Sequence, residues 1–131
     1  MTEVSFTQMK DGTRADYEFL ERLEDDHIKG LPDRIIKALA GLSEGLAGYK
    51  IDRLQHSLQT ATRAEDEGAS IDWVVAALVH DIGDELAPLS HSEFAAALLT
   101  PFVSEETVWV IEKHGLFQAY YYAHHVGGDR H

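Results

Sequence analysis

The sequence predicts an all-α fold, a bundle of about six to seven helices. Apolar residues recur at helical spacing in successive segments, and glycine or proline separates these segments. No stretch shows the alternation of apolar and polar residues that a half-buried strand needs. The 131 residues suffice for one domain with one core. We therefore assign residues 1–12 to an irregular N-terminal segment and residues 13–131 to a single helical domain.

The first predicted helix begins at Thr13, which has the spacing of a capping box with Asp16. Its apolar face runs from Tyr17 to Ile28, and its acidic opposite face is interpreted as solvated. Gly30-Leu31-Pro32 separates it from a second helix, because proline suits a first helical turn. The second helix is expected to end at the glycines of residues 45–48.

The third and fourth predicted helices lie in the middle of the chain. Asp52 opens the third, which runs to Gly68. Ser70 or its neighbour begins the fourth, which is apolar on almost every side and should therefore be central. Gly83 is expected to end it.

Three further helices are predicted over residues 90–101, 104–115 and 116–126. Ser90 has capping-box spacing with an acidic residue three positions later. Gly115 is expected to stop the sixth helix, and the seventh is rich in aromatic residues.

Composition restricts the partners. Lys and Arg total 11 against 23 Asp and Glu, and a net charge of −12 argues against a nucleic-acid partner. No apolar run approaches the roughly 20 residues that cross a bilayer, so no membrane partner is expected. The absence of cysteine excludes disulfides and thiolate metal sites and fits a cytoplasmic location. A small-molecule substrate is the expected partner, and a homodimer is left open.

Four histidines and one aspartate form the candidate functional set. The intervals between the histidines are 24, 11 and 23 residues, each about one helix plus a turn, so the side chains can converge across a bundle. One buried histidine is more often a hydrogen-bonded core residue than a ligand, but five groups at inward positions favour a metal site. Their number indicates two ions that share the aspartate. The set is His56, His80, Asp81, His91 and His114.

The segments LQHSLQ, residues 54–59, and ALVHDIG, residues 77–83, resemble the HD-domain superfamily of metal-dependent enzymes. The two further histidines make the chain similar to the di-iron HD-domain oxygenases, which include myo-inositol oxygenase and a phosphonate-cleaving oxygenase. The resemblance covers about residues 46 to 120. It implies an HD-type helical bundle in which His56, His80 and Asp81 hold one ion, while Asp81, His91 and His114 hold the other.

The chain departs from the family pattern at three places. The family's closing aspartate has no clear counterpart, because Asp129 follows two glycines. A domain without its C-terminal helices, a water ligand and a ligand from a neighbouring chain are the alternatives left open. Asp84 replaces a basic residue or histidine after HDIG, and Gln118 replaces a lysine one turn after His114.

The leading hypothesis is a dinuclear enzyme with His80 and Asp81 as catalytic residues. Iron is the expected metal, with manganese, zinc or another divalent ion as alternatives. The reaction would be oxidative cleavage of a small hydroxylated substrate, either a phosphonate or a polyol. Candidate substrate contacts are Gln59, Asp84, Glu85 and Gln118.

Two alternatives remain open. A metal-dependent phosphohydrolase would act on phosphoesters or nucleotides. Its available anion partners are Lys50, Arg53, Lys113 and Arg130. A non-catalytic metal-binding regulatory domain is the second alternative.

Overall fold

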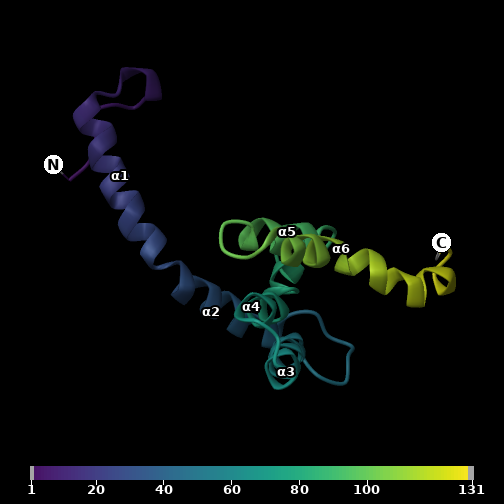
Figure 1. Cartoon of the computed structure of the whole chain (residues 1–131). Coiled ribbons are helices and arrows are strands. Elements are labelled where there is room, and N and C mark those ends of the chain that lie inside the picture. Colours follow the sequence, from purple (N-terminus) through teal and green to yellow (C-terminus); the bar gives the residue numbers. More distant parts are fainter. Residues whose placement is uncertain (1, 130–131) are drawn as a thin grey trace. The chain divides into compact units, whose positions relative to one another are not determined.

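Six α-helices and four short 3-10 turns form the regular structure of residues 2–129. The computed structural model describes these residues, apart from the side chains of residues 119–121 and 123. Arg130 and His131 lie outside the described residues. No strand occurs within residues 2–129, so the predicted all-α fold is confirmed (Figure 1). Contacts concentrate in two compact units, residues 1–37 and 38–131, and the single domain over residues 13–131 stays a prediction.

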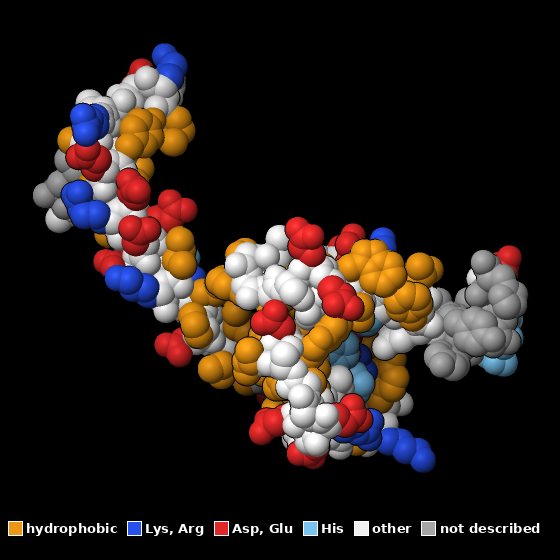
Figure 2. Space-filling view, viewed as in Figure 1, with side chains coloured by type: hydrophobic (Ala, Val, Ile, Leu, Met, Phe, Trp, Pro, Cys, Tyr) orange, Lys and Arg blue, Asp and Glu red, His pale blue; other side chains and the backbone are white. Residues whose placement is uncertain are grey.

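The N-terminal unit contains the 3-10 turn η1 (Met9–Asp11) and helix α1 (Arg14–Lys29). The predicted capping box is present: the Thr13 side chain accepts from the Asp16 amide, and the Asp16 side chain accepts from the Thr13 amide. Asp16 also accepts hydrogen bonds from the amide and hydroxyl of Ser5, at 3.0 and 2.7 Å. Acidic side chains are exposed along α1, as Figure 2 shows in red. The apolar residues Leu23 and Ile28 are exposed as well.

Helix α2 (Leu31–Gly41) starts with proline in its first turn, as predicted. It is followed by the 3-10 turn η2 (Leu42–Glu44) rather than by a continuation of the same helix. Leu39 and Leu42, on either side of this change, are both buried. They begin the core of the second unit.

The second unit consists mainly of two helix pairs. Helix α3 (Arg53–Asp66) packs on α4 (Ile71–Val79), and α5 (His91–Leu99) packs on α6 (Glu105–Tyr122). Helix α4 also contacts α6, in agreement with its predicted central position. The buried apolar residues are Leu39, Leu42, Ala61, Ala76, Val79, Ile82, Ala95, Ala96, Leu99 and Ile111.

Besides the end of α2 at Gly41 rather than at residues 45–48, three local predictions are wrong. Helix α4 ends at Val79 rather than at Gly83, and the 3-10 turn η3 (Ile82–Asp84) follows it. The side chain of Ser90 forms no capping hydrogen bond. Helix α6 runs through Gly115, so the predicted sixth and seventh helices are one.

Packing explains the continuity of α6 at Gly115. A Cβ at this position would lie 2.8 Å from the hydroxyl of Ser92 in α5. Glycine in a helix interior costs only about 1 kcal/mol relative to alanine, so tertiary contacts easily outweigh it. Among the described residues, no helix has both the length and the apolar character needed to span a bilayer.

Candidate metal centre

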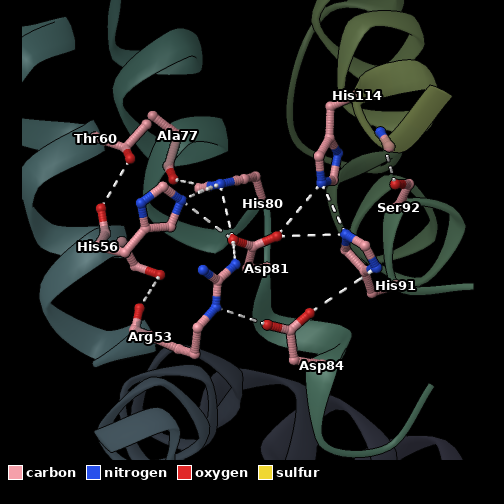
Figure 3. A network of polar contacts seen from close by, with 12 residues as sticks. Arg53, His56, Thr60, Ala77, His80, Asp81, Asp84, His91, Ser92 and His114 are labelled. Atoms are coloured by element: carbon pink, nitrogen blue, oxygen red, sulfur yellow. Dashed lines mark hydrogen bonds and ion pairs between the residues drawn. The ribbon is translucent and has the colours of Figure 1, made fainter. Parts of the chain in front are cut away.

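The structure brings the five predicted ligands together (Figure 3). His56 lies in α3, His80 and Asp81 directly follow α4, His91 begins α5, and His114 lies in α6. Each helix pair therefore contributes two histidines. At Asp81 the backbone leaves helical geometry, with φ −107° and ψ 11°. The Asp81 carboxylate lies between the two histidine pairs.

Each oxygen of Asp81 faces one pair of imidazole nitrogens. Oδ2 lies 3.3 Å from Nε2 of His56 and 3.0 Å from Nε2 of His80. Oδ1 lies 3.4 Å from Nε2 of His91 and 3.4 Å from Nε2 of His114. Within each pair, the two Nε2 atoms are 3.1 Å apart. The five side chains thus form two triads that share one carboxylate.

These separations fit two metal ions. Ligand atoms bound at about 2.1 Å from one ion lie about 3.0 Å apart at a right angle and about 3.4 Å apart at the tetrahedral angle. All six separations, from 3.0 to 3.4 Å, fall in this interval. Nitrogen and oxygen donors of this kind suit iron, zinc or manganese. The donor set therefore fits one ion on each side of Asp81.

Backbone carbonyls orient two of the rings. Nδ1 of His80 donates to the carbonyl of Ala77 at 2.6 Å, and Nδ1 of His114 donates to the carbonyl of Ile111 at 2.6 Å. Because a carbonyl can only accept, the Nε2 atom of each neutral ring keeps its lone pair. Both lone pairs face the carboxylate of Asp81. Because an imidazole lone pair and a carboxylate oxygen are both acceptors, a cation or a proton must lie between each ring and the carboxylate.

Burial and neighbouring charges set the protonation of the centre. Burial lowers the pKa of His56, and the nearby His80 adds to that effect, which favours the neutral form that binds metals. Burial also lowers the pKa of His80, but the hydrogen bond and the charge of Asp81 outweigh it, and the pKa is raised. Burial alone would raise the pKa of Asp81. Hydrogen bonding with the His114 and His80 rings, which requires the proton between each Nε2 atom and the carboxylate, and the charge of Arg53 hold that pKa well below its usual range.

Arg53 connects the centre to a second carboxylate. Its guanidinium contacts Oδ2 of Asp81, and its Nε donates to Oδ2 of Asp84 at 3.1 Å. The side chains of Arg53, Asp84 and Asp81 are 14%, 9% and 1% exposed. Asp84 also approaches Nδ1 of His91 at 3.9 Å. Arg53 thus holds the shared carboxylate on the side of His56, while Asp84 supports His91.

Sequence reasoning named Arg53 only as an anion partner and missed this role. Arg53 lies three residues before His56, so the two side chains share one face of α3. Asp81 and Asp84 are likewise three residues apart. The sequence did carry a signal for this role. Arg53 lies one helical turn before the ligand candidate His56, and the two aspartates that it contacts are three residues apart.

The four candidate substrate contacts lie in different places. Gln118 lines a cavity whose wall includes His56, His80 and His114. Asp84 is engaged by Arg53. Gln59 and Glu85 are exposed, and neither is among the described residues that line this cavity. The role of these residues in substrate binding stays a prediction.

The centre is accessible from solvent on both sides. The side chains of His56 and His91 are 33% and 25% exposed. Figure 2 shows histidine side chains in pale blue at the surface, bordered by hydrophobic ones. A small molecule can therefore reach the imidazole rings.

Residues 53–126 match the family model described as HD domain. The match includes all five ligand candidates and more than half of the chain. It does not distinguish the oxygenases of this superfamily from its hydrolases. Among curated proteins, none matches the chain significantly.

Proposed function

The chain belongs to the HD-domain family, and from that premise we propose that it is a dinuclear metal-dependent enzyme, a di-iron oxygenase that cleaves a small hydroxylated molecule. In this proposal His56, His80 and Asp81 hold one ion, while Asp81, His91 and His114 hold the other. When bound, an iron pair supplies the activation of oxygen and the oxidation of a C–H bond. The residues of the chain hold, orient and shield the reacting groups.

One observation supports two ions over one. Each oxygen of Asp81 has its own pair of imidazole nitrogens at separations that suit a common ion. A single-ion site would leave one histidine pair without a metal to bind. Imidazole and carboxylate donors without thiolate suit iron among other metals.

Several residues have defined parts in this proposal. The carbonyls of Ala77 and Ile111 keep the Nε2 lone pairs of His80 and His114 directed at the ions. Arg53 positions the shared carboxylate. Apolar residues of the cavity wall, Trp73 and Val110 among them, limit the water that reaches a bound substrate.

The test is the identity and number of metal ions in protein purified without oxygen. We expect about two irons per chain and a paramagnetic signal from the half-oxidised pair. His80→Ala should lose the ion held with His56, and with it the signal of the pair, because His80 belongs to that triad alone. His27→Ala is the matched control, because His27 is an exposed residue of α1. A protein that binds one ion or none after iron loading, with no oxygen uptake on any hydroxylated substrate, would contradict the proposal.

Phosphoester hydrolysis is the second candidate, because HD domains are generally metal-dependent hydrolases. Two ions on either side of Asp81 could activate a water and stabilise the leaving oxygen. Cleavage of p-nitrophenyl phosphate in oxygen-free buffer, dependent on manganese or cobalt, would favour this reaction over oxidation. His80→Ala should abolish that cleavage as well.

A further inference from the structure

A cavity of about 550 Å³ opens beside the metal centre, between α3, α4 and α6. Three of the four ligand histidines form part of its wall, namely His56, His80 and His114. A volume of several hundred Å³ is typical of small-molecule sites. If the proposed function holds, the reacting end of a substrate lies against these rings.

Part of the cavity wall is apolar. Trp73 and Ala77 of α4 and Val110 of α6 line it. A substrate body in contact with these side chains would gain from the removal of apolar surface from water. Apart from the histidines, the polar residues that could select a ligand are Thr60, Arg63, Glu67 and Gln118.

Arg63 is the one arginine or lysine among the described residues that line this cavity. It lies seven residues after His56 on α3, on the same helix face and about 10 Å further along the axis. Side chains on a helix lean toward its N-terminus, so the Arg63 side chain leaves the helix on the side of His56. Within residues 2–129, Arg63 has no ion pair and its side chain has no hydrogen bond.

The charges around Arg63 favour the binding of an anion on one side of its guanidinium. The chain carries a net charge of −12, so anions are generally repelled from it. Glu67, the one carboxylate among the described lining residues, lies one turn beyond Arg63 and further from His56. An anion bound on the His56 side of Arg63 is therefore closer to the cation than to this carboxylate.

We propose that Arg63 binds an anionic group of the substrate, a carboxylate or a phosphate-type group, at the end of the cavity remote from the metal ions. The inference rests on the proposed function for the position of the reacting end. The helix spacing then sets the substrate's length: its anionic group lies no more than about 10 Å from the reacting atom. The amide of Gln118, in the same cavity wall, is available for a hydrogen bond to the polar groups between them.

The test uses zinc-loaded protein and three probes with one apolar chain length: butylphosphonate, pentanoate and pentanol. Binding is followed by the NMR shift of the Trp73 indole, which lines the cavity. The indole of Trp109 lines a different cavity and serves as an internal reference. Arg63→Gln is compared with Arg22→Gln, which removes the same charge from an exposed position in α1.

We expect one or both anionic probes to move the Trp73 signal and to bind about ten- to a hundredfold more weakly to Arg63→Gln, as loss of a charged hydrogen bond predicts. Pentanol should bind both proteins equally, and Arg63→Lys should recover part of the affinity. A response to butylphosphonate alone would assign a phosphate-type group, and a response to pentanoate alone would assign a carboxylate.

The inference would be overturned by equal affinity in Arg63→Gln, by an equal loss in Arg22→Gln, or by no response of Trp73 to either anion. A loss confined to Lys113→Gln would also overturn it, because Lys113 lines a separate cavity next to His91. The metal content of each sample separates this inference from the proposed function. Two ions per chain with no effect of Arg63 refutes only the anion site. Arg63-dependent binding in a protein that holds no metal refutes only the enzyme.

Discussion

Arg53→Met is predicted to destabilise the metal-free protein and to strengthen metal binding. Arg53 contacts Asp81 and hydrogen-bonds Asp84, and both carboxylates are almost fully buried. Removal of one partner from a buried ion pair costs about 3–5 kcal/mol in the free energy of unfolding. For a domain of this size, the melting temperature should fall by about 10 °C or more.

The same substitution removes a positive charge next to the proposed ion of His56 and His80. Two unit charges 4 Å apart interact by about 4 kcal/mol at an effective dielectric constant of 20, and the ion is divalent. The relief of this repulsion exceeds the small loss from a less constrained carboxylate. We therefore expect metal affinity at this side to rise at least about tenfold, or by about 1.4 kcal/mol.

The assay is thermal unfolding of wild type and Arg53→Met, each with a chelator and with saturating zinc. Metal should raise the melting temperature of the variant by more than that of wild type, since tighter ligands stabilise more. Arg22→Met is the control for hydrophobic replacement of an exposed arginine. The reasoning is refuted if the chelated variant is as stable as wild type, or if zinc stabilises it less.

Three further predictions follow from single residues. Asp81→Asn should reduce the metal content to at most one ion per chain, measured by elemental analysis, since both triads use this carboxylate. Gly83→Ala should weaken metal binding in calorimetry, because its Cβ would lie 2.9 Å from Cβ of Phe94 and 3.1 Å from the backbone of His91; unchanged affinity would count against this. Hydrogen bonds from the Thr13 and Ser5 amides lower the pKa of Asp16, so its contribution to stability is complete above about pH 4, the unfolded value, and is lost as the pH falls toward the folded value. The protection of the Thr13 amide against exchange, relative to its intrinsic rate at each pH, should fall on acidification in wild type and should be low at every pH in Asp16→Asn.

Much of the helical pattern was predictable because it depends on local signals. The capping box at Thr13 and the cap at Asp52 both form as the residue types indicate. The course of α6 was not predictable, because the contact of Gly115 with Ser92 joins residues 23 positions apart. The spacing of residues along one helix does not indicate which side chains a neighbouring helix brings into contact with it.

The candidate centre, too, was predictable only in part. The histidine intervals were enough to predict that five side chains could converge, and the structure gathers them. The end of α4 at Val79 was hidden, because apolar residues keep their helical spacing from Leu78 and Val79 to Ile82. The role of Arg53 was not predictable, because it depends on the turn that brings Asp84 next to α3. This contact joins residues 31 positions apart.

The division of the imidazoles between two helical hairpins has a consequence for folding. The α5–α6 hairpin contributes only His91 and His114 to its triad, and among the described residues the third candidate ligand, Asp81, directly follows α4. An ion bound by Asp81, His91 and His114 would therefore link the α3–α4 hairpin to the α5–α6 hairpin. Removal of the metal ions by a chelator should therefore weaken the packing between the two hairpins before either hairpin unfolds. Backbone amides at the contact between the hairpins would be the first to exchange with solvent.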